Sequence, residues 1–286
     1  MNKSTYLTEI GAFGSPFEHD ITSCTGIPPK NHKWIFNTVP ENGTVVYMDH
    51  DIMGGFESTA TYKYLWMCES RAIVPHQHQI LRKNFSIFAD CYRIIFTHDD
   101  DLLSIGPPFA YAPPAANHTW IRAPKIYRKS KLCSIVSSGK SFCDGHRYRN
   151  EIVSLILEKN KFIEFYGRHH RPFNTKEEVL VDYMFSITIE NEIYDDYYTE
   201  KLIDCFATGT VPIYMGSTKI FSKFDDRGVI RILKDSITNS LDFSYLSADL
   251  YNTLLPFVEH NFGLLATHST SDDFIHRRIE LDIGGL

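Results

Sequence analysis

The chain lacks several features that would assign it to a broad class of protein. None of its six cysteines forms a Cys-x-x-Cys pair, so a zinc site is not indicated and reduced core thiols are expected. No stretch approaches the roughly 18 apolar residues of a membrane span, and the N-terminus shows no apolar core of signal-peptide length. A net charge of −6 argues against a nucleic-acid partner. These absences predict a soluble, cytoplasmic protein without a transmembrane segment.

The composition and the order of elements predict an α/β protein. Hydrophobic residues make up 43% and charged residues 22% of 286 residues, enough for one large or two modest domains. Apolar, strand-like runs alternate with helical patterns over short connections, which indicates βαβ units and parallel sheets. The strand-like runs are 43–47, 92–96, 132–136, 161–166, 185–189 and 211–214, and the helical ones are 148–158, 199–208 and 217–224.

A linker is predicted between two domains. The run 107–114 is rich in Pro and Ala, and 123–131 carries four basic residues with little helical pattern. We therefore place the boundary near residue 125, giving domains of 1–125 and 126–286. The last helical segment, 274–281, closes the second domain and is a candidate to pack back on the first.

The segment 195–216 is the most informative part of the sequence. Thr199, Glu200 and Lys201 open a short amphipathic helix that stops at Gly209, before an apolar strand. A helix N-terminus favours anions through its unpaired N–H groups and its dipole. Lysine would neutralise a phosphate and glutamate would accept from ribose hydroxyls. The site predicted is therefore one for a nucleoside diphosphate, although Thr199 would cap the helix and Glu200 would favour its dipole in any protein.

This segment and the preceding strand resemble the donor-binding motif of the α-1,3-fucosyltransferases. The resemblance covers about residues 130–235 and, faintly, 62–103. It implies a GT-B fold, in which an acceptor-side and a donor-binding Rossmann-like domain face each other across a cleft. It also implies GDP-fucose as donor, a glycan hydroxyl as acceptor, inversion, and no obligatory cofactor or metal. The matching residues are Glu190, Asn191, Tyr197, Thr199, Glu200, Lys201, Thr210, Pro212 and Gly216.

The resemblance, together with the residues themselves, predicts roles for further residues in and around the motif. Arg149 matches an arginine that contacts the donor at a helix start, with Arg147 as its close rival. Ser137 and Ser138 end a strand and would offer hydroxyl and N–H groups to phosphate. Glu190 would lie near the transferred sugar. Tyr197 and Tyr198 would either stack on the base or sugar or pack in the interior.

Glu69 is the candidate general base. It matches the glutamate of the family's Trp-Met-x-x-Glu-Ser-Pro segment, but the spacing is one residue shorter and Arg71 stands where proline is usual. The alternative is an ordinary carboxylate at a strand end.

Two other functions fit the sequence. Asp99 and Asp101 form the Asp-x-Asp pattern with which some glycosyltransferases hold a divalent metal on another nucleotide sugar. The competing interpretation is a loop or helix-cap cluster. His76 and His78 are interpreted as surface histidines without a third metal ligand. The remaining alternative is a module that binds a nucleotide sugar or glycan without chemistry.

Overall fold

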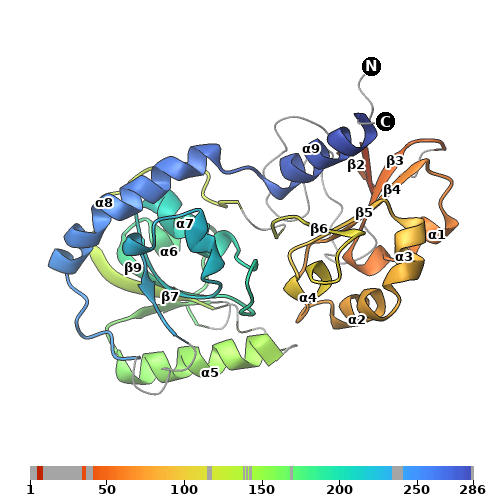
Figure 1. Cartoon of the computed structure of the whole chain (residues 1–286). Coiled ribbons are helices and arrows are strands. Elements are labelled where there is room, and N and C mark those ends of the chain that lie inside the picture. The colour runs from red at the N-terminus through yellow and green to blue at the C-terminus, as the bar shows by residue number, and fades with distance from the viewer. Residues whose placement is uncertain are drawn as a thin grey trace. The chain divides into compact units, whose positions relative to one another are not determined.

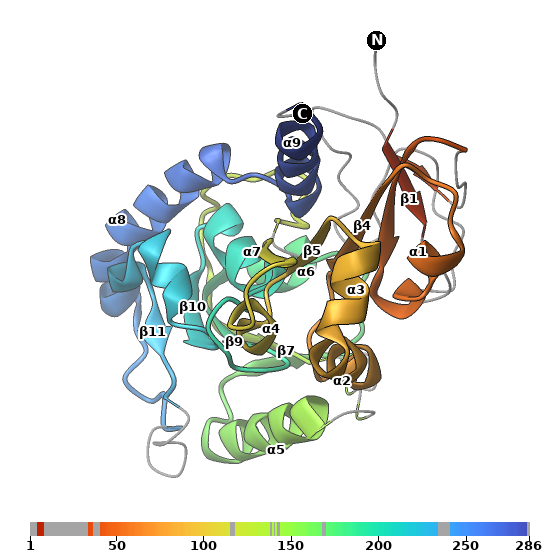
Figure 2. The same cartoon turned by 45° about the vertical axis from the view of Figure 1, so that its right-hand side comes forward.

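The computed structural model forms two compact units (Figures 1 and 2). It describes residues 5–8, 34–36, 41–114, 118–137, 139, 141, 144–167, 170–233 and 241–284. The first unit comprises Met1–His118, Tyr194–Tyr197 and Ser269–Leu286, and the second comprises Thr119–Ile193 and Tyr198–His268.

The first unit contains a parallel sheet in the order β2-β1-β3-β4-β5-β6. Its central strands are mostly buried and apolar, typical of a parallel sheet covered on both faces. Ile275 and Ile279 of α9 pack in one cluster and Leu81 and Phe88 of α2 and α3 in another. The strands are β1 (Thr5–Thr8), β2 (Trp34–Phe36), β3 (Thr44–Met48), β4 (Tyr62–Met67), β5 (Ile94–Thr97) and β6 (Phe109–Tyr111). The helices are η1 (Asp49–Asp51), α1 (Gly54–Glu57), α2 (Pro75–Lys83), α3 (Phe85–Cys91), α4 (Asp100–Leu103) and α9 (Ser271–Gly284).

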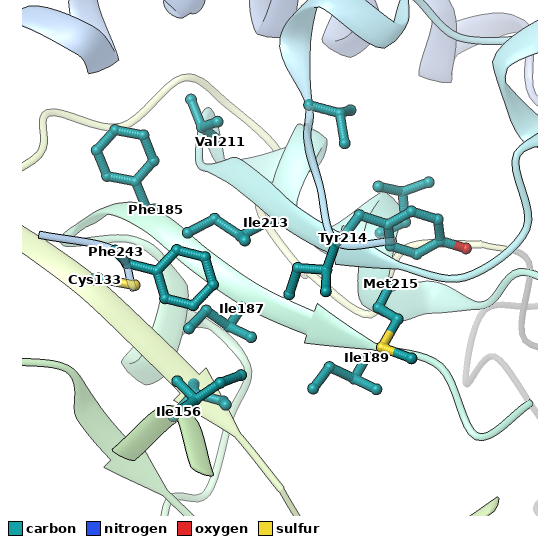
Figure 3. Packing of buried hydrophobic residues seen from close by; sticks show 14 of the residues in the cluster. Cys133, Ile156, Phe185, Ile187, Ile189, Val211, Ile213, Tyr214, Met215 and Phe243 are labelled. Carbon is teal, nitrogen blue, oxygen red and sulfur yellow. The ribbon is translucent and has the colours of Figure 1, made fainter. Parts of the chain in front are cut away.

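The second unit contains a parallel sheet in the order β11-β10-β9-β7-β8. Helix α5 lies on one side of it, and α7 and α8 lie on the other (Figures 1 and 2). Ile156 of α5 packs in one cluster with Ile187 of β9 and Ile213 of β10 (Figure 3). The strands are β7 (Lys131–Val136), β8 (Glu164–Tyr166), β9 (Tyr183–Ile189), β10 (Val211–Met215) and β11 (Ile230–Arg231). The helices are α5 (Asp144–Lys159), α6 (Glu177–Leu180), α7 (Glu200–Thr208), η2 (Lys219–Ser222), η3 (Asp226–Gly228), α8 (Ala248–Leu264) and η5 (Leu265–Thr267).

Helix α7 begins and ends where the sequence predicts. Thr199 is its N-cap, and Gly209 ends it in the left-handed conformation with φ 73°. A Cβ at Gly209 would also lie 3.0 Å from Ile126 Cγ2. Glycine is therefore favoured here both by the left-handed backbone conformation and by the lack of space for a side chain. Strand β10 follows and pairs with β9, with Val211 opposite Phe185. The helix N-terminus is thereby fixed against a rigid sheet.

Two predicted elements are wrong. The helix expected over 217–224 is only the 3-10 helix η2. The run 107–114, expected to be a linker, contributes β6 to the first sheet by pairing Ile95 with Phe109. The prolines at 107, 108, 113 and 114 flank β6, which is an edge strand of that sheet, where proline is tolerated.

The two units differ from the predicted domains of 1–125 and 126–286. Thr119 and Trp120 belong to the second unit because both donate to the buried carboxylate of Asp204, at 2.8 and 2.7 Å. Helix α9 belongs to the first unit, where Asp282 accepts from the hydroxyl of Tyr64 at 2.5 Å. The C-terminal helix thus packs with the first unit, in agreement with one of the two expectations for it, and is not part of the second domain.

Candidate functional site

The predicted donor residues gather where strands of the second sheet end. Ser137 follows β7, Glu190 and Asn191 follow β9, and Thr199 caps α7. In open α/β sheets, ligands bind beyond the carboxyl ends of the strands. The location therefore agrees with the general rule for this fold.

Glu190 ties the end of β9 to the start of α7. Its Oε1 accepts from the backbone N–H of Thr199 at 2.9 Å, and its Oε2 accepts from the Thr199 hydroxyl at 2.8 Å. Lys201 Nζ donates to the same Oε2 at 3.2 Å and to Thr199 Oγ1 at 2.8 Å. A Cβ at Gly216 would come within 2.8 Å of Glu190 Cγ, so glycine leaves room for this carboxylate. The ammonium of Lys201 is thus held in a defined place.

Glu200 and Lys201 each favour the charged form of the other. Burial alone would lower the pKa of Lys201, but the carboxylates of Glu190 and Glu200 outweigh it and raise that pKa. Burial would raise the pKa of Glu200, but Lys201 and Lys176 hold it below its ordinary value. Both side chains are therefore charged at neutral pH, the state that contacts to a nucleotide would need.

Arg149, not its rival Arg147, joins this cluster. Arg149 projects from α5, is 6% exposed, and donates through Nη1 to Asn191 Oδ1. Arg147 is exposed and donates to the carbonyl of Ser141 at 3.1 Å. The charge of Arg149 also acts on Lys201, where it opposes part of the rise in pKa that the two carboxylates cause. Two neighbouring cations of this kind suit a diphosphate, whose charge would relieve their repulsion.

Ser137 and Tyr198 make other contacts than those expected of donor-binding residues. The Ser137 hydroxyl donates to Asn150 Oδ1 at 3.2 Å, and its N–H donates to the Tyr166 carbonyl at 3.0 Å. Tyr198 is 2% exposed within the apolar cluster, and its hydroxyl accepts from Lys223 at 3.3 Å. Interior packing is therefore the role seen for Tyr198. Ser138 lies outside the described residues.

Sequence reasoning missed Lys176 and Asp204. Lys176 Nζ lies 3.7 Å from Glu200 Oε1 and 3.7 Å from Asp204 Oδ2. Asp204 is fully buried, and burial raises its pKa to about 6. The four-residue spacing of Glu200 and Asp204 on one helix was a signal that could have identified Asp204. No local pattern distinguishes Lys176.

In the first unit, the backbone around Glu69 is held by a buried aspartate. Asp49 Oδ1 accepts from the N–H groups of Cys68 and Glu69 at 2.9 and 3.1 Å. His78 Nε2 lies 3.4 Å from the carbonyl of Glu69. Burial raises the pKa of Asp49. Glu69 itself is partly exposed at the end of β4, an accessible position on a fixed loop.

Arg71 binds the acidic run that was the alternative metal site. Its Nε lies 2.9 Å from Asp99 Oδ2 and its Nη1 3.1 Å from Asp101 Oδ2, and it also pairs with Asp100. Asp99 is 2% exposed and caps α4 by accepting from the Leu102 N–H at 3.1 Å. The helix-cap interpretation therefore describes this cluster, and the ion pairs give a reason for arginine where proline is usual.

His78 is not the surface residue that the sequence suggested. It is 7% exposed, and its Nδ1 lies 3.1 Å from Asp99 Oδ2. Among the residues that the structure describes, no group of three or more His, Cys, Asp or Glu side chains is arranged to hold a metal ion.

A known family model matches the central part of the chain. The model of glycosyltransferase family 10 (fucosyltransferase), C-terminal part, matches residues 126–241. The predicted family resemblance is confirmed. The family 10 domain, as we call residues 126–241, contains every predicted donor-binding residue, whereas Glu69 lies outside it.

Similar proteins extend the likeness beyond the family 10 domain. The 4-galactosyl-N-acetylglucosaminide 3-alpha-L-fucosyltransferase 9 of Bos taurus is 24% identical over 234 residues, which are 76% of this chain and 59% of that protein. This chain therefore spans under two thirds of that relative's length.

Solved structures support the fold class. The crystal structure of an alpha1,3-fucosyltransferase with GDP has a TM-score of 0.50 at 14% identity, covering 85% of this chain and 84% of the other. The pneumococcal O-GlcNAc transferase GtfA with UDP and GlcNAc has a TM-score of 0.53 at 10% identity, covering 85% of this chain and 57% of the other. At such identities the likeness shows the fold alone, and it confirms two Rossmann-like units of the GT-B class. None of the described helices is long and apolar enough to cross a membrane.

Proposed function

We propose that this chain is an inverting glycosyltransferase that moves fucose from GDP-fucose to a hydroxyl of a glycan acceptor. The observation that carries the proposal is the cluster of Glu190, Lys201 and Arg149 at the start of α7, within the family 10 domain. GDP is the nucleotide bound in the alpha1,3-fucosyltransferase structure, which supports a guanosine donor here.

The charges of the cluster suit a departing diphosphate. Lys201 is fixed by Glu190 and Thr199 before any ligand arrives, so little reorganisation is needed when negative charge develops. Arg149 adds a planar donor group that matches phosphate oxygens. Glu200 would accept hydrogen bonds from the ribose hydroxyls. Positioned cations can do here what a divalent metal does in other transferases, so no metal is required by the proposal.

The proposed reaction is a single displacement. Glu69 takes the proton of the acceptor hydroxyl, and that oxygen forms a bond to the anomeric carbon of fucose. The bond from this carbon to the phosphate oxygen breaks, and its electron pair leaves with GDP. Attack opposite the leaving group inverts the configuration at the anomeric carbon.

A nucleotide panel tests the donor assignment. Thermal unfolding is measured with GDP, UDP and CMP, because a ligand at a hundred times its Kd stabilises by about 2.7 kcal/mol. A rise in Tm of about 5 °C with GDP alone is expected. Stabilisation by UDP but not GDP would sink the proposal in favour of another donor.

A transfer assay tests the activity. Incubation with GDP-fucose and a panel of N-acetyllactosamine-type and other oligosaccharides should release GDP only when an acceptor is present. Transfer should persist in excess EDTA. Tight GDP binding without turnover on any acceptor would instead support a non-catalytic module, and loss of turnover in EDTA would support the metal-dependent alternative. The cytoplasmic location expected from the sequence stays a prediction.

A further inference from the structure

Lys176 lies between two carboxylates that are one turn apart on α7. Its Nζ is 3.7 Å from Glu200 Oε1 and 3.7 Å from Asp204 Oδ2. The side chain of Lys176 is 16% exposed, and those of Glu200 and Asp204 are 8% and 0% exposed. These separations exceed hydrogen-bond length, so the interaction is Coulombic, and burial strengthens it.

The surroundings fix Lys176 and Asp204 in this arrangement. Asp204 Oδ1 accepts from the Thr119 hydroxyl at 2.8 Å and from the Trp120 N–H at 2.7 Å. Asp204 Oδ2 has no hydrogen-bond partner in the described part of the chain, so Lys176 is the cation that faces it. Lys176 Nζ also lies 5.5 Å from the centroid of the Trp120 ring. The lysine is thus held over the two carboxylates.

Without Lys176, one of these carboxylates would be expected to take up a proton. Buried like charges four residues apart on a helix repel and raise each other's pKa. Glu200 also faces Lys201, 3.8 Å away, but that ammonium is shared with Glu190. Apart from Lys176, the groups that face Asp204 are Glu200, Cys205, Thr119 and Trp120, and none of these is a cation. Burial already raises the pKa of Asp204 to about 6.

We propose that Lys176 is a positioning residue for the donor, which offsets the charge of Asp204 and thereby keeps the carboxylate of Glu200 oriented to accept from the ribose hydroxyls. This inference rests on the proposed function, because the ribose contact of Glu200 belongs to it. Lys176 acts through Glu200, and Asp204 is the second charge that makes Lys176 necessary.

The test compares GDP with 2′,3′-dideoxy-GDP, which lacks both ribose hydroxyls. The ratio of their Kd values isolates the ribose contact from phosphate and base contacts. Isothermal titration is performed on the wild type and on Lys176→Met, Lys176→Arg and Lys176→Met with Asp204→Asn. The asparagine keeps the oxygen that Thr119 and Trp120 require while removing the competing charge.

The wild type should prefer GDP by about tenfold or more at any pH between about 6.5 and 8.5, as expected for a charged hydrogen bond. Lys176→Met should keep this preference near pH 6.5, where Asp204 takes up a proton and no longer repels Glu200, and should lose it towards pH 8.5, where both carboxylates are charged. Lys176→Arg and the double variant should keep most of the preference at both values.

Other results would overturn the inference. An unchanged Kd ratio in Lys176→Met at both pH values contradicts it. So does an equal weakening of both nucleotides together with a lower Tm, which indicates a purely structural lysine. If Lys176→Met does not fold, Lys176→Gln serves in its place. Failure of the wild type to bind GDP would overturn the proposed function itself, which distinguishes the two failures.

Discussion

The ammonium of Lys201 and the carboxylate of Glu190 lie 3.2 Å apart and share the hydroxyl of Thr199 between them. Glu190 is fully buried, and the Lys201 side chain is 23% exposed. The anion is thus inside the protein while the cation retains access to solvent. A lysine held in this way can meet a phosphate without first being ordered, which is the condition for efficient electrostatic catalysis.

Replacing Lys201 with methionine should lower kcat by about 10²–10³-fold, comparable to the loss of one preorganised donor to developing charge. The rate of fucose transfer from GDP-fucose to an acceptor is the quantity measured. Lys161→Met is the matched control, because Lys161 is an exposed lysine of the same unit and should leave turnover unchanged. Equal turnover in the two variants would refute the role given to Lys201.

Glu69→Gln should lower kcat by about 10²–10⁴-fold while leaving the Kd for GDP unchanged, because a general base acts on the acceptor and not on the nucleotide. Transfer rate and GDP titration are measured on the same preparation. Glu57→Gln, an exposed glutamate of the first unit, is the control. A variant that still transfers fucose at the wild-type rate would leave Glu69 as an ordinary strand-end carboxylate.

Asp204→Asn should become more stable relative to the wild type as the pH rises from 4 to 7. The pKa of Asp204 is raised from 3.8 to about 6 in the folded state, so between these values the folded chain binds more protons than the unfolded one. The unfolding free energy of the wild type therefore falls with rising pH over this range, and the variant lacks this loss. The difference should shift by about 1–3 kcal/mol in favour of the variant. Urea denaturation at several pH values measures it, and a constant difference would contradict the assignment.

Arg71→Met should destabilise the chain by about 1–3 kcal/mol, because Asp99 is buried and would lose a charged partner. Arg82→Met is the matched control. Arg82 pairs with Asp101 at 3.0 Å, but its side chain is 63% exposed, so its loss should cost about 0–1 kcal/mol. Denaturant midpoints at constant m-value compare the two. Equal effects would mean that burial of Asp99 does not determine the strength of this cluster.

Lys129→Met should destabilise the chain by about 2–4 kcal/mol, because several acceptors lose their donor at once. Lys129 Nζ donates to the carbonyls of Leu180, Val181 and Thr208 at 3.2, 3.0 and 2.8 Å and to Thr210 Oγ1 at 2.9 Å. Lys125→Met, an exposed lysine nearby, should change the unfolding free energy little. Thermal and denaturant unfolding of the two variants decide whether Lys129 has this structural role.

The predicted linker 123–131 shows the limit of a local pattern. Its basic residues indicate a solvated connection, yet the Lys125 N–H donates to the Ala207 carbonyl at 3.0 Å, and Lys129 donates to the carbonyl of Thr208, the last residue of α7. A lysine side chain is long enough to satisfy buried carbonyls far away in sequence. Composition cannot distinguish that arrangement from exposure to water.

The sequence alone was enough to predict the local structure of the donor segment. A threonine cap, a first-turn glutamate and lysine, an amphipathic helix, a terminal glycine and a buried strand are signals between neighbouring residues, so each could be interpreted before the fold was known. Only the tertiary structure decided that Arg149 rather than Arg147 joins this segment and that Lys176 stands beside Glu200 and Asp204. It also decided that α9 belongs with the first unit. Those contacts join residues that are distant in the chain. Burial strengthens the electrostatic interactions between them, and a local sequence pattern indicates neither the contact nor the burial.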